Sequence, residues 1–92
     1  MSTAFAATVE VTNRLGIHAR AAARLVDLAN QYESHIELSK DGQVADAKSI
    51  MGVLLLCSQR GSKITFRATG ADAEQALAAL CELVKDGFGE DR

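Results

Sequence analysis

The sequence predicts an α+β domain in which helices cover one face of a four-stranded sheet, either antiparallel or mixed. Four short segments alternate apolar and polar residues with a period of two, which is typical of half-buried strands. Three other segments repeat apolar residues at helical spacing. The alternation leaves one face of the sheet open to water. The expected order is β-α-β-β-α-β-α, and a chain of 92 residues is expected to form one domain, residues 1–92.

The four strands are expected where the alternation is clearest. They occupy residues 5–12, 36–39, 43–47 and 64–68. Asp41 and Gly42 separate the second strand from the third. This dipeptide favours a two-residue hairpin, because both residues tolerate a positive φ.

The three helices are predicted from apolar stripes and from residues that can cap them. The first spans residues 19–32, and the second spans residues 49–57 with Ser49 as its cap. The third follows Asp72, which is expected to cap it. The buried stripe of the third helix is expected to contain Ala76, Leu77, Leu80, Val84 and Phe88.

Composition and charge exclude several classes of function. A net charge of -2 and an aromatic content of 4% argue against nucleic-acid binding. No apolar run reaches membrane-spanning length and no secretion signal is recognisable, so a cytoplasmic protein without membrane insertion is expected. Cys57 and Cys81 are distant from each other and lie in apolar helical contexts, which predicts buried free thiols and no metal site.

A candidate functional residue, His18, lies directly after a glycine turn and directly before the first helix. The first N–H groups of a helix lack intrahelical partners, and together with the helix dipole they favour an anion. A phosphoryl group on His18 would be received by the amides of Ala19 and Arg20 and by the Arg20 guanidinium. This spacing suits a histidine that accepts and gives up phosphate. On position alone, however, His18 is more often a capping or surface residue, and His35 has only that interpretation.

Four stretches of the chain resemble the HPr family, the histidine-containing phosphocarriers of the bacterial phosphotransferase system. The resemblance rests on G-I-H-A-R-A-A (16–22), A-K-S-I-M-G-V (47–53), R-G-S-K-I-T-F (60–66) and D-G-F-G-E (86–90). It implies an open-faced β-sandwich, in which three helices cover one face of a four-stranded antiparallel sheet.

The resemblance also implies a function and its residues. His18 would take a phosphoryl group on Nδ1 from enzyme I, which receives it from phosphoenolpyruvate, and would pass it to a IIA component. Arg20 would be the charge partner of the phosphate. Ser49 matches the family's regulatory site, which an HPr serine kinase/phosphorylase modifies in some bacteria. The chain would then be a monomeric carrier without a cofactor, and not an enzyme.

The second helix and the histidine loop are expected to form one docking surface for donor and acceptor proteins. Met51 is the candidate for its exposed apolar contact, with a core position as the alternative. Ile50 and Leu54 share a different face of the same helix. Arg24 and Lys48 would add positive charge at the rim, which suits acidic partners, unless both are merely solvated.

Ala21 departs from the family, which usually has proline at this position. Alanine supports the helix, but the change is expected to alter phosphotransfer. An alternative function is therefore a regulatory paralogue, either of a nitrogen-related branch or a Ser49-dependent binding module, with altered or lost transfer. A hydrolase of the acylphosphatase type would need a glycine-rich phosphate loop that the sequence lacks. An RNA-binding sheet is disfavoured by the charge and the aromatic content.

Overall fold

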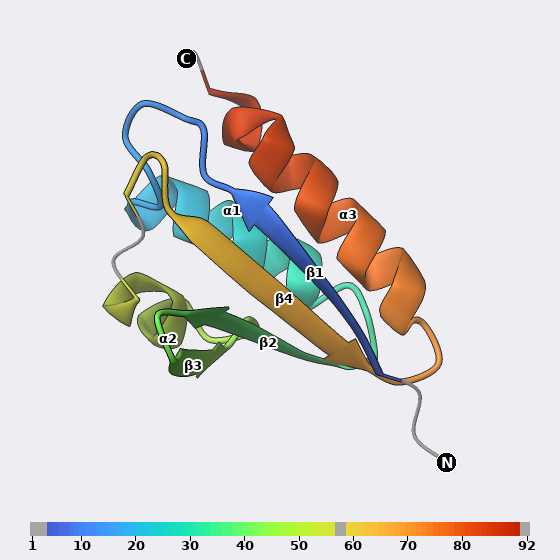
Figure 1. Ribbon diagram of the computed structural model, residues 1–92. Coiled ribbons are helices and arrows are strands. Elements are labelled where there is room, and N and C mark those ends of the chain that lie inside the picture. Colours follow the sequence, from blue (N-terminus) through green and yellow to red (C-terminus); the bar gives the residue numbers. More distant parts are fainter. Residues whose placement is uncertain (1–3, 57–58, 91–92) are drawn as a thin grey trace.

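The computed structural model describes residues 4–56 and 59–90 (Figure 1). Its elements follow the expected order and end with one additional short turn. They are β1 (Ala4–Glu10), α1 (Ala19–Ala29), β2 (His35–Lys40), β3 (Gln43–Asp46), α2 (Ile50–Leu55), β4 (Lys63–Thr69), α3 (Ala73–Lys85) and a 3-10 turn (Gly87–Gly89).

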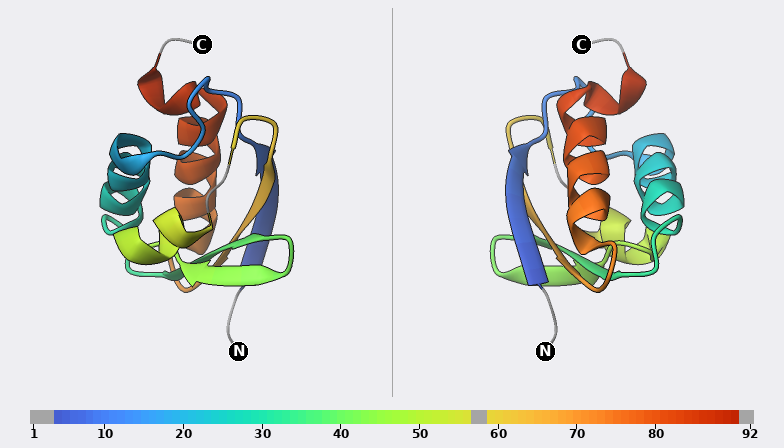
Figure 2. Two further views of the ribbon diagram at one scale, coloured as in Figure 1. Left: turned by 90° about the vertical axis from the view of Figure 1, so that its left-hand side faces the viewer. Right: turned by 90° about the vertical axis from the view of Figure 1, so that its right-hand side faces the viewer.

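The strands form one sheet in the order β1-β4-β2-β3, and every neighbouring pair is antiparallel. The expected open-faced sandwich is therefore confirmed, and a mixed sheet is not formed. Views from the side show the three helices on one face of this sheet and nothing on the other (Figure 2). At the hairpin, Asp41 and Gly42 have φ values of 52° and 82°, as a tight turn between β2 and β3 requires.

The core lies between the sheet and the helices, because the strand register aligns apolar side chains on the face that the helices cover. Ala7 of β1 faces Phe66 of β4, which in turn faces Leu38 of β2. Apolar rows from three strands thus meet the buried stripes of α1 and α3. The opposite face is largely polar: Thr8 and Thr65 share a hydrogen bond of 2.8 Å between their hydroxyls. Val44 of β3, which lies opposite Ser39, is an exposed apolar residue on this face, with 61% of its surface accessible.

The first helix ends earlier than predicted, at Ala29 instead of Tyr32. The side chain of Asn30 donates to Val26 O at 2.9 Å and to Lys48 O at 3.4 Å. Asn30 therefore ties the end of α1 to the chain that leads into α2, and the backbone turns away. Tyr32 still packs against the core from outside the helix.

Other boundaries differ by one to two residues, for local reasons. β1 stops at Glu10 because Val11 turns to a loop, where it accepts from Gly61 N and donates to Ser62 O, each at 2.8 Å. β3 stops at Asp46, whose carbonyl begins a turn by accepting from Ser49 N at 3.0 Å. β2 and β4 are each one residue longer at both ends than predicted. α2 is shorter, because Ser49 is its cap and Leu56 ends it.

Asp72 precedes α3 as expected, but its side chain does not cap the helix. Its carboxylate instead accepts hydrogen bonds from Glu33 N at 2.9 Å, Ser34 N at 3.0 Å and the Ser34 hydroxyl. Gly70 permits this approach, since a Cβ there would lie 2.5 Å from Ser34 Oγ. The hydrogen bond from the Ser34 hydroxyl, with those from the backbone, lowers the pKa of Asp72.

The predicted stripe of α3 is confirmed at Ala76, Leu77, Leu80 and Val84, which are all buried. Phe88 is also buried, but it lies in the 3-10 turn beyond the helix. Cys81 is a free thiol that is half-buried instead of fully buried, and this burial raises its pKa. Cys57 lies outside the described residues.

Three further expectations concern His35, metal ions and membranes. His35 is exposed at the start of β2, as expected for a surface residue, and its Nε2 lies 3.3 Å from Glu37 Oε2. Across residues 4–56 and 59–90, no group of three or more His, Cys, Asp or Glu side chains could hold a metal ion. None of the helices in these ranges is long and apolar enough to cross a membrane.

We predict that Asp72→Asn lowers the melting temperature at neutral pH, because the carboxylate charge strengthens three hydrogen bonds. A lowered pKa means that this stabilisation is present above the unfolded value of 3.8 and is lost as the pH falls through the folded value. The difference between parent and variant should therefore shrink below pH 3.8, as thermal unfolding followed by circular dichroism would show. Glu82→Gln, on the exposed side of α3, controls for the loss of one negative charge. A difference that is the same at every pH would contradict the prediction.

Candidate functional site

His18 occupies the N-cap position of α1, at the end of a turn that Gly16 makes possible. Gly16 has a φ of 66° and donates its N–H to Asn13 O at 3.1 Å. Nδ1 of the His18 ring then accepts a hydrogen bond from the backbone N–H of Arg20 at 3.2 Å. An amide that would lack a partner in the first helical turn is thereby satisfied by the imidazole. The His18 side chain is 26% exposed, so the ring is accessible from solvent.

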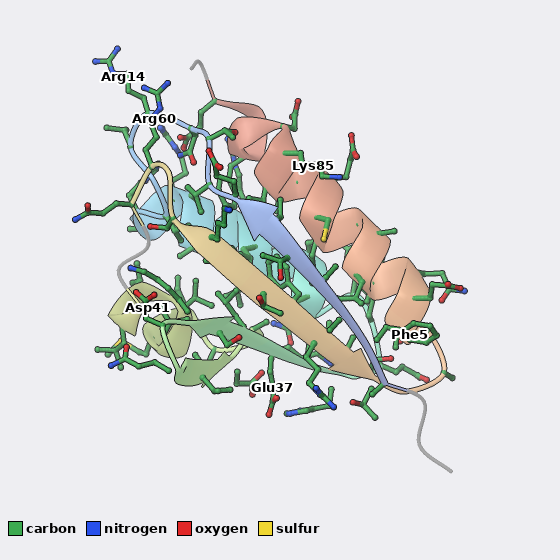
Figure 3. All side chains as sticks on the ribbon, in the orientation of Figure 1. Phe5, Arg14, Glu37, Asp41, Arg60 and Lys85 are labelled. Atoms are coloured by element: carbon green, nitrogen blue, oxygen red, sulfur yellow. The ribbon has the colours of Figure 1, made fainter. Side chains whose placement is uncertain are left out.

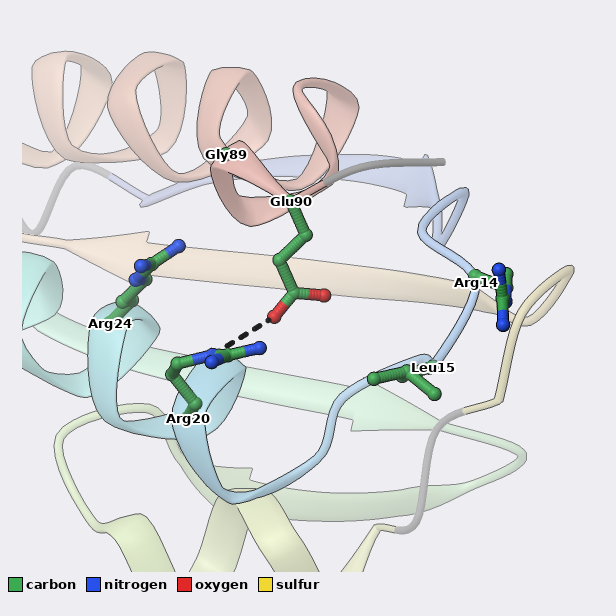
Figure 4. A pocket seen from close by; sticks show the side chains of 6 residues that line it. All are labelled: Arg14, Leu15, Arg20, Arg24, Gly89 and Glu90. Carbon is green, nitrogen blue, oxygen red and sulfur yellow. Dashed lines mark ion pairs between the residues drawn. The ribbon is translucent and has the colours of Figure 1, made fainter.

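Glu90 approaches the other ring nitrogen, a contact that sequence reasoning missed. Its Oε2 lies 2.6 Å from His18 Nε2, and its Oε1 accepts from the Asn13 side chain at 2.9 Å. The Arg20 guanidinium lies near the same carboxylate, with Nε 3.6 Å from Oε2 (Figure 4). Glu90 belongs to the D-G-F-G-E stretch, but nothing in the local pattern indicated that it would face a residue 72 positions earlier.

The two contacts of the His18 ring select one tautomer. Nδ1 accepts from a backbone N–H, so it must present its lone pair. Nε2 faces a carboxylate, so it must carry the hydrogen that it donates to Glu90. The ring nitrogen that presents its lone pair is therefore Nδ1, and it faces the positive end of α1.

Three consecutive residues with positive φ bring Glu90 back to the site. Gly87, Phe88 and Gly89 have φ values of 65°, 58° and 74°. Phe88 is only 1% exposed, so burial of its ring holds a conformation that a non-glycine residue rarely adopts. Arg24 of α1 also donates from its guanidinium to Phe88 O. The end of the described chain is thus attached to α1.

The environment of Glu90 favours its charged form. Burial by itself would raise the pKa of this carboxyl, whose side chain is only 10% exposed. Hydrogen bonds from Asn13 and His18 and the charge interactions with His18 and Arg20 oppose burial and lower the pKa below its usual value. A carboxylate that stays charged keeps the His18 ring oriented.

Chemically, this arrangement suits transfer of a phosphoryl group. Nδ1 offers a lone pair, and the amides of Ala19 and Arg20 at the start of α1 can receive anionic oxygens. The Arg20 guanidinium is 64% exposed, so it can turn toward such a group. Ala21, which stands where the family usually has proline, is fully buried within α1.

Ser49 lies near the opposite end of α1 from His18. Its hydroxyl caps α2 by accepting from Gly52 N at 3.2 Å. Lys48 donates from Nζ to Tyr32 O at 2.7 Å, just beyond the C-terminus of α1, so it is not a freely solvated side chain. Since α1 has 11 residues, its length separates the two ends by about 16 Å. The histidine loop and the start of α2 are therefore not adjacent, although α2 packs against α1.

The apolar candidates of α2 differ in exposure. Met51 is 66% exposed and Ile50 is 41% exposed, so a core position for Met51 is wrong. Leu54 is half-buried and packs against the core. Sequence reasoning missed Leu55, which is 73% exposed, and Leu15, which is 64% exposed beside the site.

The structure is similar to known phosphocarriers. Residues 5–86 match the family described as PTS HPr component phosphorylation site. The phosphocarrier protein HPr of Xylella fastidiosa is 47% identical over 81 residues, which cover 88% of this chain and 91% of that protein. The phosphocarrier protein NPr of Escherichia coli is 44% identical over 85 residues, 91% of this chain and 94% of that protein. A crystal structure of HPr-C-His from Thermoanaerobacter tengcongensis superposes with a TM-score of 0.92 at 39% identity, covering 96% of this chain and 99% of that one.

We predict that Glu90→Ala weakens the tautomer preference of His18, because the Nε2 hydrogen loses its carboxylate acceptor. The loss of one hydrogen bond to a charged group corresponds to a change in the tautomer ratio on the order of tenfold. Ring nitrogen chemical shifts of the neutral imidazole report this ratio directly. Glu90→Gln, which keeps an acceptor oxygen, should change it less, and Glu74→Ala at the exposed start of α3 should not change it. A protonated Nδ1 in the parent protein would contradict the assignment.

Proposed function

The chain belongs to the HPr family of phosphocarrier proteins, and from that premise we propose that it carries a phosphoryl group on Nδ1 of His18. The donor is phospho-enzyme I and the acceptor is a IIA component, both in the cytoplasm. The observation that carries this proposal is the Nδ1 lone pair, which is directed at the first amides of α1 while Glu90 holds Nε2. The chain acts as a stoichiometric carrier and not as an enzyme, and a monomer with a small interface suits rapid release of each partner.

The transfer can be written as a balanced exchange of bonds. The Nδ1 lone pair attacks the phosphorus of the phosphohistidine on enzyme I, and the phosphorus–nitrogen bond of the donor breaks with its electron pair returning to the donor ring. The hydrogen stays bonded to Nε2 of His18 and is donated to the Glu90 carboxylate throughout, so the carboxylate stabilises the positive charge that develops on the ring. The Arg20 guanidinium and the helix amides receive the phosphoryl oxygens. The same steps in reverse deliver the group to the IIA component.

Ser49 is proposed as a second, regulatory phosphorylation site. As the N-cap of α2, its hydroxyl is at a position where a phosphate dianion is tolerated. The added charge would lie beside the exposed side chains of Ile50 and Met51, which we propose as part of a docking surface. A dianion there would repel an acidic partner. The kinase would be an HPr serine kinase/phosphorylase.

The second candidate function is a regulatory paralogue whose transfer differs from that of a sugar-system carrier. Two observations favour it. A relative named NPr matches the chain almost as well as one named HPr, at 44% against 47% identity. In addition, Ala21 provides a backbone N–H in the first turn of α1, where a proline would provide none. The pathway would then be the nitrogen-related branch, or Ser49 would control a binding module.

Intact-mass measurement tests the carrier function. After incubation with phosphoenolpyruvate and enzyme I, the parent should gain one acid-labile phosphoryl group and His18→Ala should gain none. With ATP and an HPr serine kinase, the parent should gain an acid-stable group that Ser49→Ala lacks. A parent that stays unmodified with the enzyme I of its own organism would reject phosphotransfer at His18.

We predict that Ala21→Pro shortens the lifetime of phosphorylated His18. The amide of residue 21 has no intrahelical acceptor in the first turn and can donate to the phosphoryl group, and proline removes this donor. Loss of one hydrogen bond to a charged group corresponds to about a tenfold change in this lifetime. Decay of the phosphorylated form, followed by mass spectrometry, measures the lifetime, and Ala23→Ser on the same helix is a control. If Ala21→Pro and the parent had equal lifetimes and transfer rates, Ala21 would no longer support the regulatory paralogue.

A further inference from the structure

A surface hollow of about 440 Å³ lies beside the site, between α1, the loop that follows β1 and the 3-10 turn (Figure 4). We call it the arginine pocket. It is lined by Arg14, Leu15, Arg20, Arg24, Gly89 and Glu90.

The charge of the arginine pocket is opposite to that of the whole chain. The chain has a net charge of -2, whereas the pocket lining carries three guanidinium groups and one carboxylate. Both oxygens of that carboxylate, Glu90, are already engaged by Asn13 and His18. The lining therefore has an excess of two positive charges that an anionic ligand would neutralise.

The three arginines keep donors available for such a ligand. Arg14 projects away from the loop after β1 (Figure 3), and within residues 4–56 and 59–90 it has no hydrogen-bond or ion-pair partner. Arg24 is held in place by one hydrogen bond to Phe88 O, which orders the side chain but uses only one guanidinium nitrogen. Arg20 lies 3.6 Å from Glu90, longer than a hydrogen bond.

The lining of the pocket overlaps only partly with the groups around His18. Arg20, whose amide faces Nδ1, and Glu90, which contacts Nε2, belong to both. His18 itself does not line it. Arg14 and Arg24 therefore have a location that the transfer chemistry does not require.

We propose that the arginine pocket binds a small polyanion that carries two or more phosphate or carboxylate groups. Guanidinium groups bind both kinds of oxyanion through paired hydrogen bonds, and three of them around one hollow can hold more than one anionic group. The volume is that of a site for a small molecule. The exposed side chain of Leu15 offers an apolar contact for the body of the ligand. The binding itself does not depend on phosphotransfer.

A ligand in the arginine pocket would share Arg20 with the transfer site. Its anionic groups would compete with Glu90 and with a phosphoryl group for the same guanidinium. Occupancy would therefore slow phosphorylation of His18 and make the carrier responsive to the concentration of the ligand. This consequence rests on the proposed function.

Nuclear magnetic resonance titration of the unphosphorylated full chain tests the inference. Pyrophosphate and citrate serve as separate probes for phosphate and carboxylate ligands, at constant ionic strength and without enzyme I. We expect saturable shifts at the amides of Leu15 and Gly89 with at least one probe. Arg14→Gln should weaken binding by about tenfold, as expected for one charge-assisted contact. Arg67→Gln, an exposed arginine of β4 with the same change in net charge, should bind as the parent does.

Three outcomes would overturn the inference. The first is chemical shift changes that do not saturate with either probe, and the second is equal weakening of probe binding by Arg14→Gln and Arg67→Gln. The third is tighter binding of an acidic peptide than of either probe, which would assign the pocket to a partner protein. Intact-mass measurement with enzyme I is independent of all three. If neither probe binds in the arginine pocket while His18 is phosphorylated normally, the result would therefore reject this inference and leave the proposed function intact.

Discussion

The start of α1 imposes the constraint on which the site depends: the first N–H groups of a helix need an acceptor that the helix cannot supply. Serine, threonine and aspartate usually meet this need with oxygen, but here a ring nitrogen of His18 meets it. A histidine used in this way must present a lone pair at Nδ1. A structural requirement of the helix thereby fixes the orientation and the tautomer of the His18 ring.

The opposite ring nitrogen makes the site depend on the far end of the chain. Glu90 reaches Nε2 only because α3 ends before a turn of three residues with positive φ, anchored by the buried ring of Phe88. The position of α3 depends in turn on the sheet and on the hydrogen bonds between Asp72 and the segment before β2. The loop that carries His18 is thus held in place by contacts from both ends of the fold. Loosening of α3 would release the imidazole without any change in the loop itself.

Local patterns predicted most of the fold, because alternation, helical stripes and the Asp41-Gly42 turn are properties of neighbouring residues. They also placed His18 at the start of α1 and Ser49 at the start of α2. The polar contacts that were missed at the site and at the helix ends involve residues distant in sequence: Asp72 with Ser34, Asn30 with Lys48, and Glu90 with His18. A polar side chain has several possible partners, and only the packed structure decides among them.

Under the proposed transfer, the charges around His18 would act on two different parts of a phosphorylated ring. The amides of α1 and the Arg20 guanidinium would attract a dianion on Nδ1. Glu90, kept charged by its own hydrogen bonds, lies 2.6 Å from Nε2 and would stabilise the positive charge that the ring acquires on phosphorylation. One carboxylate therefore contributes to two properties: it orients the unphosphorylated ring, and it would offset the charge of the phosphorylated one.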